Sequence, residues 1–159
     1  MINAFAEIPN DDYQLIICGS GTLAPFLKEQ SFKDSRIIFK GLVPREEAVI
    51  LQQRATALIN PRKPNSKITR FSFPSKTMEY LSSGTPMIGY KLDGIPSEYY
   101  DYFYTIDDSS EKSLRNTIVK VLSLPQEALD EKAFAAHQFI ESHKTSKIQV
   151  KKILDFLSE

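Results

Sequence analysis

The sequence has one cysteine, two histidines, no tryptophan and no excess of either charge, with 20 Lys and Arg against 20 Asp and Glu. A lone Cys18 cannot form an internal disulfide, which favours a reducing cytoplasm, and its position in the apolar run 15–18 predicts a buried thiol. His137 and His143 are spaced to lie on different sides of a helix, so we expect no metal site. The balanced charge leaves no overall positive field to attract nucleic acid or an anionic membrane.

Long hydrophobic runs are missing too. No stretch approaches the roughly 18 apolar residues of a membrane span, and residues 1–6 lack the basic segment of a signal peptide, so nothing predicts export or a membrane anchor. The composition is typical of a soluble globular domain: 159 residues, 42% hydrophobic and 25% charged, without internal repeats or a linker. We therefore expect a single domain over residues 1–159.

Apolar runs alternate with amphipathic helical patterns along the chain. The runs are short and continuous, which is typical of parallel strands covered on both faces. This order predicts an α/β fold: a Rossmann-like doubly wound parallel sheet of about five strands flanked by helices. We expect strands at 13–18, 36–39, 55–59, 86–90 and 103–106, and helices at 2–6, 23–29, 45–54 and 75–83, followed by a helical C-terminus.

The first expected helix carries apolar Ile2, Phe5 and Ala6 on one face and has no strand before it. In a fold that alternates strands and helices, this position predicts a domain truncated at its N-terminal side within a larger α/β protein.

Loops that follow strands are the expected ligand-binding segments, because an open parallel sheet binds ligands beyond the carboxyl ends of its strands. The loop Gly19-Ser20-Gly21 would let backbone amides approach a phosphate, although an ordinary tight turn explains these residues equally well. A basic loop at 60–72 contains Arg62, which is a candidate phosphate or sugar contact or, equally, a solvated surface arginine.

The segment 71–86 has the most specific pattern. Ser75 can cap the helix, so that the free amides of Lys76, Thr77 and Met78 would face an anion such as a diphosphate. Glu79 follows one helical turn, about 5 Å, further on, where its carboxylate would accept hydrogen bonds from both hydroxyls of a ribose. The alternative is a solvated Glu79 and a Ser75 that only caps.

This segment resembles the signature of group 1 glycosyltransferases, in which seven residues separate two Glu, and a small residue, Gly and Thr-Pro or Lys-Pro follow. Glu79 matches the second Glu, and Gly84-Thr85-Pro86 matches the end of the signature. The similarity covers about residues 1–110 in the same order. Further matches are the strands and turns at 15–21, 38–43 and 57–61 and the turn at 93–98.

The resemblance implies the donor-binding half of a GT-B fold. It implies transfer of a sugar from a nucleoside diphosphate sugar to an acceptor hydroxyl, with retention of configuration and without an obligatory metal or other cofactor. Glu79 would hold the ribose, the glycine turn and the helix start would approach the diphosphate, and Val43-Pro44 would border the base. The implied setting is polysaccharide or glycolipid assembly in the cytoplasm, with the full-length enzyme peripheral at the inner face of the membrane. The candidate nucleotide contacts are Gly19, Ser20, Gly21, Val43, Pro44, Arg62, Phe73, Pro74, Ser75, Lys76, Thr77 and Glu79.

The sequence also departs from the family pattern. Phe71 occupies the position of the first signature Glu, so no catalytic residue is assigned. The acceptor-binding domain, and the Arg and Lys with which the family clamps the diphosphate, would precede Met1 in the same polypeptide. We therefore expect the isolated chain to bind nucleotide weakly and to transfer no sugar.

Other functions fit less of the pattern. A noncatalytic nucleotide- or nucleotide-sugar-binding module stays an alternative, with Phe71 marking lost catalysis. A receiver-like signalling domain is disfavoured, because Asp11 and Asp12 precede the first strand and no Asp ends the strand at 55–59.

Overall fold

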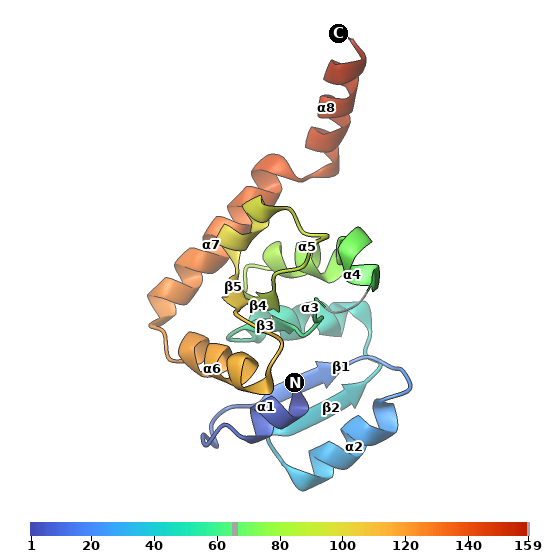
Figure 1. Ribbon diagram of the computed structural model, residues 1–159. Coiled ribbons are helices and arrows are strands. Elements are labelled where there is room, and N and C mark those ends of the chain that lie inside the picture. The colour runs from blue at the N-terminus through green and yellow to red at the C-terminus, as the bar shows by residue number, and fades with distance from the viewer. Residues whose placement is uncertain (65–66, 159) are drawn as a thin grey trace.

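The computed structural model describes residues 1–64 and 67–158. Parallel strands alternate with helices along the chain (Figure 1), which confirms the predicted α/β class. In chain order the elements are α1 (Ile2–Ala6), β1 (Leu15–Cys18), α2 (Ala24–Lys33), β2 (Ile37–Gly41), α3 (Arg45–Arg54), β3 (Leu58–Asn60), α4 (Lys67–Phe71), α5 (Ser75–Leu81), β4 (Met87–Tyr90), the 3-10 helix η1 (Ser97–Tyr102), β5 (Tyr104–Ile106), α6 (Glu111–Leu122), α7 (Gln126–His143) and α8 (Ser146–Leu157).

The five described strands are all parallel, as expected, but they form two sheets instead of one. In the smaller sheet β1 pairs with β2, with Leu15 opposite Ile37. The larger sheet has the order β3-β4-β5, with Leu58 opposite Met87. Within the described residues β1 and β3 do not pair with each other, so the sheet is interrupted between them.

The main core is centred on β4, whose four residues are all buried. Continuous burial is the pattern of an interior parallel strand covered on both faces. α6 covers the core with Leu114, Ile118 and Val121, each at most 1% exposed. Burying each such side chain contributes about 1.5–3 kcal/mol. α6 begins at a Ser110 cap, whose hydroxyl accepts from the amide of Ser113 at 3.0 Å.

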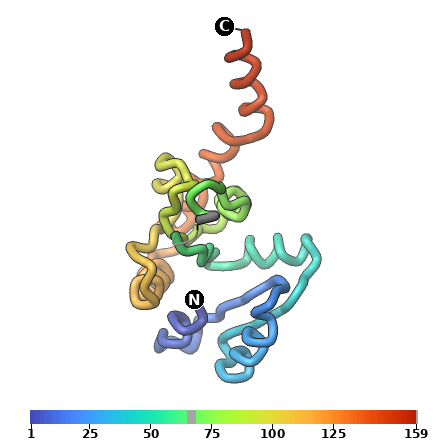
Figure 2. The backbone as a smooth tube through the Cα atoms, turned by 45° about the vertical axis from the view of Figure 1, so that its right-hand side comes forward, coloured from blue at the N-terminus to red at the C-terminus, as the bar shows by residue number. Residues whose placement is uncertain are grey.

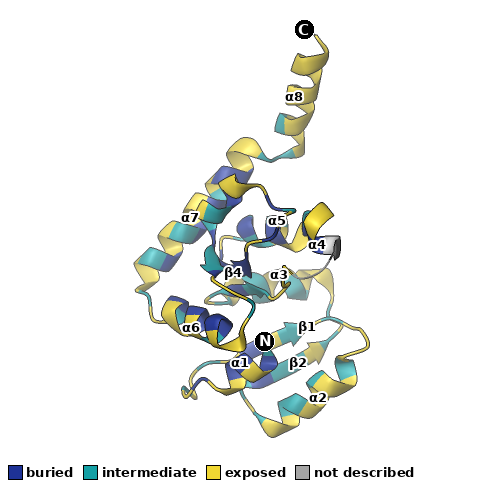
Figure 3. Cartoon of the chain, viewed as in Figure 1, coloured by how far each residue is buried: buried dark blue, intermediate teal, exposed yellow. Residues whose placement is uncertain are grey.

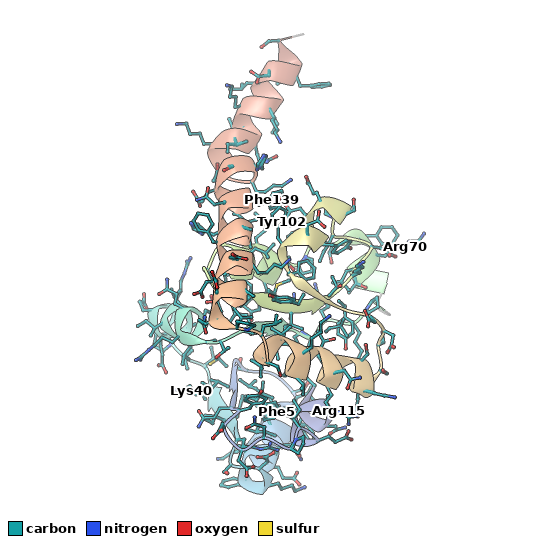
Figure 4. All side chains as sticks on the ribbon, turned by 90° about the vertical axis from the view of Figure 1, so that its left-hand side faces the viewer. Phe5, Lys40, Arg70, Tyr102, Arg115 and Phe139 are labelled. Atoms are coloured by element: carbon teal, nitrogen blue, oxygen red, sulfur yellow. The ribbon has the colours of Figure 1, made fainter. Side chains whose placement is uncertain are left out.

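α1 packs against α6 and so joins the N-terminal part of the chain to the main core (Figure 1). The apolar side chains of α1 are buried in this contact, and Phe5 is only 2% exposed. Polar contacts border this seam: Asn3 donates to Glu111 at 3.0 Å, and Arg115 pairs with Glu7. Figure 4 shows Phe5 and Arg115 near each other at this seam.

Arg36, just before β2, ties the end of α1 and the loop that follows it to the smaller sheet. Its guanidinium donates to the carbonyl oxygens of Ile8 at 2.6 Å, Asn10 at 3.0 Å and Ala6 at 3.2 Å. It also pairs with Asp34 at 2.7 Å. The rigid fork of donors on an arginine suits several acceptors at once, so Arg36 fixes the turn between α1 and β1.

The predicted helical C-terminus is confirmed as α6, α7 and α8. α8 buries none of its residues and extends away from the body of the molecule beyond α7 (Figure 3). It keeps an apolar stripe in solvent, made of Val150, Ile153, Leu154 and Leu157, each more than half exposed. None of the helices in the described part of the chain has the length and hydropathy needed to cross a membrane.

Some local predictions were wrong. Cys18 is exposed rather than buried, because it points with Ile16 to the face of the sheet that is left uncovered, while Leu15 and Ile17 point to the opposite face. The expected loop at 60–72 contains α4, and η1 follows the turn at 93–96. η1 is a 3-10 helix of six residues, whose period of three residues differs from the 3.6 of an α-helix, and α4 has five residues with only two large apolar positions, Ile68 and Phe71.

Candidate functional site

The glycine turn after β1 has backbone conformations that favour glycine. Gly19 and Gly21 have φ angles of 135° and 155°, which residues with a side chain rarely adopt. The amide of Gly19 donates to the carbonyl of Gly41 at 2.7 Å, which fixes the turn beside the end of β2. Ser20 and Gly21 are exposed. The turn therefore leaves an open backbone surface at the carboxyl ends of β1 and β2.

Asn60 and Thr77 join the end of β3 to α5. Asn60 Nδ2 donates to Thr77 Oγ1 at 3.4 Å, and Asn60 Oδ1 accepts from the amide of Arg62 at 3.4 Å. Thr77 is fully buried, and its amide donates to the carbonyl of Pro74 at 2.9 Å. The prediction that this amide is free was therefore wrong, because Thr77 uses it within the first turn. The side chain of Arg62 is exposed.

α5 begins without a side-chain cap. Pro74, not Ser75, is the N-cap, and Ser75 is the first helical residue, which corrects the predicted cap. Pro74 has a φ of −72°, which suits a helix start and needs no hydroxyl. Phe73 supports this start through its ring, 5.1 Å from the ring of Tyr99. Ser75 and Lys76 remain exposed on the outside of the turn.

Glu79 is held by two donors. Gln52 Nε2 lies 2.6 Å from Glu79 Oε1, and Lys76 Nζ lies 2.9 Å from both carboxylate oxygens. Burial raises the pKa of Glu79, but the hydrogen bonds from Lys76 and Gln52, with the charges of Lys76 and Arg45, outweigh it and lower the pKa overall. The Glu79 side chain is 43% exposed, so an ionised carboxylate with spare lone pairs faces solvent in a fixed position.

The candidate residues fall into two groups that α3 connects. One group lies at the ends of β1 and β2: the glycine turn, and Val43 and Pro44, of which Pro44 is the N-cap of α3. The other lies at the end of β3 and on α5. α3 starts beside the first group and reaches the second through the bond between Gln52 and Glu79.

Sequence reasoning missed Gln52 and Asn60 as parts of this site. Gln52 also accepts from the hydroxyl of Thr85 at its carbonyl, at 2.8 Å, so it joins α3 to the end of the signature segment. Its role depends on a contact 27 positions away, which no local pattern carries. The sequence could have indicated Asn60 as a site residue, because it is the polar residue that ends an apolar strand.

Phe71, at the position of the missing signature Glu, is 82% exposed. The guanidinium of Arg70 lies 5.4 Å from the centre of its ring. The position therefore presents an apolar ring with a cation beside it where the family pattern has a carboxylate. A phenyl ring can neither accept a hydrogen bond from a sugar hydroxyl as a carboxylate does nor stabilise a positive charge to the same extent.

Two hollows, of about 180 and 340 Å³, lie beside β4 and β5. The smaller is lined by residues such as Tyr90, Lys91 and Asp108, and none of the candidate nucleotide contacts lines either hollow. Of the candidate contacts, Ser20, Gly21, Ser75 and Lys76 are exposed to solvent. Within the described residues no three His, Cys, Asp or Glu side chains are grouped as a metal site requires.

The sequence pattern of a known family extends over most of the chain. The profile described as glycosyl transferases group 1 matches residues 1–138. The chain belongs to the group 1 glycosyltransferases. The match includes every candidate contact from the glycine turn to Glu79, and it extends beyond the region in which the signature resemblance was traced.

Solved structures of other proteins share the fold. HepE of Anabaena, solved with UDP, is 16% identical with a TM-score of 0.75, and the match covers 99% of this chain and 43% of HepE. Its complex with UDP-glucose has a TM-score of 0.73 at the same identity and coverage. A glycosyltransferase of Rickettsia africae is 14% identical with a TM-score of 0.76, covering 98% of this chain and 42% of that protein. The chain thus spans less than half the length of these structures. No curated protein matches it.

Proposed function

We propose that this chain is the donor-binding half of a glycosyltransferase that transfers a sugar from a nucleoside diphosphate sugar to an acceptor hydroxyl with retention of configuration. The observation that carries the proposal is the fixed, ionised carboxylate of Glu79 on α5, beside the end of β3. Ligands of open parallel sheets bind at these strand ends. The UDP and UDP-glucose complexes of HepE, which has the same fold, support this ligand class.

In this proposal Glu79 binds the ribose. A carboxylate accepts hydrogen bonds from two neighbouring hydroxyls at once, and Gln52 and Lys76 hold this one in place beforehand. Lys76 adds a positive charge next to the ribose, close to the diphosphate that is attached to it. Because Gln52 and Lys76 already hold the Glu79 carboxylate in position, few side chains lose freedom when the nucleotide binds. The entropic cost of binding is therefore small.

The diphosphate then lies between the two groups of candidate residues. The exposed backbone of Gly19 to Gly21 approaches it from the end of β1, and the exposed Ser75 and Lys76 approach it from α5. Arg62 is a further phosphate or sugar contact. Val43 and Pro44 border the base, while Phe73, Pro74 and Thr77 shape the start of α5. Backbone amides and cations suffice for the diphosphate in this arrangement, so the proposal needs no metal or other cofactor.

Sugar transfer itself requires a second domain that covers the bound donor. The acceptor-binding domain of the same polypeptide closes over the donor and excludes water, which otherwise hydrolyses the activated sugar. The 159-residue chain alone therefore binds nucleotide and transfers no sugar. The proposed setting of the whole enzyme is polysaccharide or glycolipid assembly in the cytoplasm, including the inner face of the membrane.

A noncatalytic nucleotide- or nucleotide-sugar-binding module is the second candidate. The exposed ring of Phe71 favours it, because no carboxylate is present at that position to assist at the sugar. Both candidates predict nucleotide binding, and only the first predicts turnover by the full-length polypeptide.

The binding test is calorimetric titration with UDP, GDP and ADP. We expect one diphosphate to bind, and Glu79→Ala to weaken its binding by about 1 kcal/mol or more, the size expected for hydrogen bonds to a charged group. Glu29→Ala is the matched control, because Glu29 forms a similar exposed ion pair with Lys33 on α2. Equal losses in the two variants would reject the ribose assignment.

The turnover test uses the full-length polypeptide and the 159-residue chain with a radiolabelled donor sugar of the preferred nucleotide. Transfer by the full-length polypeptide and none by the short chain is the expected result. If the full-length polypeptide binds nucleotide but neither transfers nor hydrolyses the sugar, the noncatalytic candidate replaces the first. If it binds no diphosphate even at millimolar concentration, both fail.

A further inference from the structure

The smaller of the two hollows lies at the carboxyl ends of β4 and β5. Tyr90 ends β4 and pairs with Ile106, which ends β5, while Lys91 and Asp107 follow the two strands. All four residues line the hollow, which has a volume of about 180 Å³. Open parallel sheets bind their ligands beyond these strand ends. The hollow therefore occupies a position where this class of fold binds ligands.

The hollow is separate from the candidate nucleotide contacts, none of which lines it. It adjoins the larger hollow, because Thr105 and Asp107 line both, and the larger hollow extends between β5 and α6. Figure 2 shows α6 (orange) on the left of the molecule and α3 (teal), which connects the two groups of candidate nucleotide contacts, on the right. A ligand in the hollow would thus occupy a site of its own.

The hydroxyl of Tyr90 is the feature that points to a ligand. Tyr90 is 3% exposed, and its hydroxyl is the one buried side-chain oxygen or nitrogen of the described residues without a hydrogen-bond partner. Most buried polar groups of native proteins have a partner, because an unpaired group keeps the full cost of its removal from water. The Tyr90 hydroxyl is therefore available to a polar group of a ligand.

Two carboxylates line the hollow with Tyr90. Burial raises the pKa of Tyr90 and the charge of Asp108 raises it further, so the hydroxyl keeps its proton and lies close enough for this carboxylate to act on it. Hydrogen bonds from Ser110 lower the pKa of Asp108, so Asp108 is ionised. Asp108 Oδ1 accepts from the amide of Ser110 at 2.7 Å, which leaves further lone pairs of the carboxylate free. Asp107 is exposed.

Lys91 is the one cation among the residues that line the smaller hollow. Its ammonium lies 5.5 Å from the centre of the Tyr100 ring, which holds the side chain near the end of β4. One ammonium beside two carboxylates gives no excess of positive charge. The charge of the hollow therefore disfavours a phosphate or another anionic ligand.

A neutral hydroxyl group suits this combination. It accepts the proton of Tyr90 through a lone pair and donates its own proton to Asp108, whereas an ammonium has no lone pair to accept from Tyr90. A water makes the same bonds but needs only roughly 10–15 Å³ of such a volume. Pockets for drug-sized ligands have roughly 300–1,000 Å³. The hollow thus has the size for one small ligand with several hydroxyls.

We propose that this hollow binds one ring of a neutral carbohydrate, whose hydroxyls bond to Tyr90, Asp107 and Asp108. Lys91 donates to a further oxygen of the ring. The larger hollow, to which α6 contributes Asn116, continues from the first and offers polar partners to a second sugar unit. This carbohydrate is not joined to the nucleotide, because the hollow lies apart from the nucleotide contacts.

The first test is NMR titration of the 159-residue chain with glucose, galactose, mannose and N-acetylglucosamine. We expect at least one of them to shift the amide resonances of Lys91 and Asp107 saturably, with a Kd of about 1 mM, the usual order for a few neutral hydrogen bonds. No saturable shift with any of the four would overturn the proposal. So would shifts that spread evenly over the surface without saturation, since these mean non-specific contact.

The second test removes the unpaired hydroxyl. Tyr90→Phe should weaken sugar binding about three- to tenfold, the loss of one neutral hydrogen bond. It should leave the urea midpoint unchanged or raise it, because this hydroxyl has no partner in the free chain. An unchanged affinity would overturn the proposal, whatever the midpoint does.

Tyr100→Phe is the matched control. The Tyr100 hydroxyl lies 2.8 Å from the carbonyl oxygen of Leu92 and 3.0 Å from that of Ile95. Its removal should therefore lower the urea midpoint and leave sugar binding unchanged. An equal loss of affinity in Tyr90→Phe and Tyr100→Phe would reject the role of Tyr90.

Two further titrations separate this site from the nucleotide site. Glu79→Ala should leave sugar binding unchanged, because Glu79 does not line the hollow. Excess UDP should not displace the sugar. Displacement by UDP would mean that the hollow belongs to the nucleotide site and would overturn the proposal, whereas sugar binding by a chain that binds no nucleotide would reject only the proposed nucleotide site.

Discussion

The side-chain amide of Gln52 donates to Glu79 across the space between α3 and α5, with Nε2 and Oε1 2.6 Å apart. Gln52 therefore sets the position of the carboxylate from a helix that begins beside the other group of candidate residues. Its carbonyl also accepts from Thr85, so the residue is fixed at both ends. In the proposed function Gln52 is a positioning residue, because it acts on the ribose through Glu79.

Gln52→Ala should weaken nucleotide binding by about 1 kcal/mol, since the hydrogen bond that orients a charged partner is lost. Calorimetric titration with the preferred diphosphate measures the change. Gln53→Ala, at the exposed neighbouring position, is the control and should leave the affinity unchanged. A loss of the same size at both positions would show that α3 as a whole, rather than the bond to Glu79, determines affinity.

Glu79 should titrate below the ordinary range of a glutamate. Its folded pKa is lowered, so its contribution to stability is present above the unfolded pKa, about 4.3, and is lost as the pH falls through the folded value. Carbon-detected NMR of the carboxyl group measures the midpoint directly. Lys76→Met should move that midpoint upward, because it removes a donor and a charge. A midpoint at or above the ordinary value in the unaltered chain would contradict the observed pairing.

Gly94→Ala should destabilise the chain by about 1–3 kcal/mol, the usual range for overpacking. An added Cβ would lie 2.5 Å from the carbonyl oxygen of Ser72 and 2.9 Å from that of Thr69, and both are backbone atoms that can move only with the loop. Urea unfolding measures the loss. Asp93→Ala, at the exposed neighbouring position, is the control, and a loss no larger than the control's would refute the close approach.

Removing α8 should change the free energy of unfolding of residues 1–145 by no more than about 0.5 kcal/mol, because α8 buries none of its residues. By contrast, Ile118→Ala, at a position 1% exposed in the main core, should cost about 2–5 kcal/mol. Both are measured by urea unfolding. A large loss on removal of α8 would mean that its apolar stripe packs against the body in solution.

The sequence predicted the elements that have strong periodicity. The helix at 45–54 agrees with α3 at both ends, and the strand at 86–90 with β4 to within one residue. The strand expected at 55–59 is shorter and begins later in the structure, where β3 covers 58–60. Apolar runs indicate where a strand can form, whereas its ends depend on the length of the neighbour with which it pairs.

The arrangement of those elements was less predictable. The apolar run of β1 predicts cover on both faces, and nothing in it shows that the face carrying Ile16 and Cys18 is uncovered, so the exposure of Cys18 could not be foreseen. Glu79 was found because it lies within a sequence signature. Gln52 was not found, because its contact joins two elements that are distant in sequence. Such a contact produces no recognisable pattern in the sequence of either element.

Buried side chains are divided unevenly along the chain. α2 and α3 bury none, β1 and β2 bury only Leu15 and Ile37, and β4 buries four. Unfolding of the 159-residue chain should therefore occur in two stages, since few apolar contacts hold segment 15–54 to the rest. A protease at low concentration would cut within that segment first and leave the core around β4, α6 and α7 intact. Cooperativity of the whole domain thus depends on the few contacts that join the two parts, chiefly those of α1 with α6 and the bond between Gln52 and Glu79.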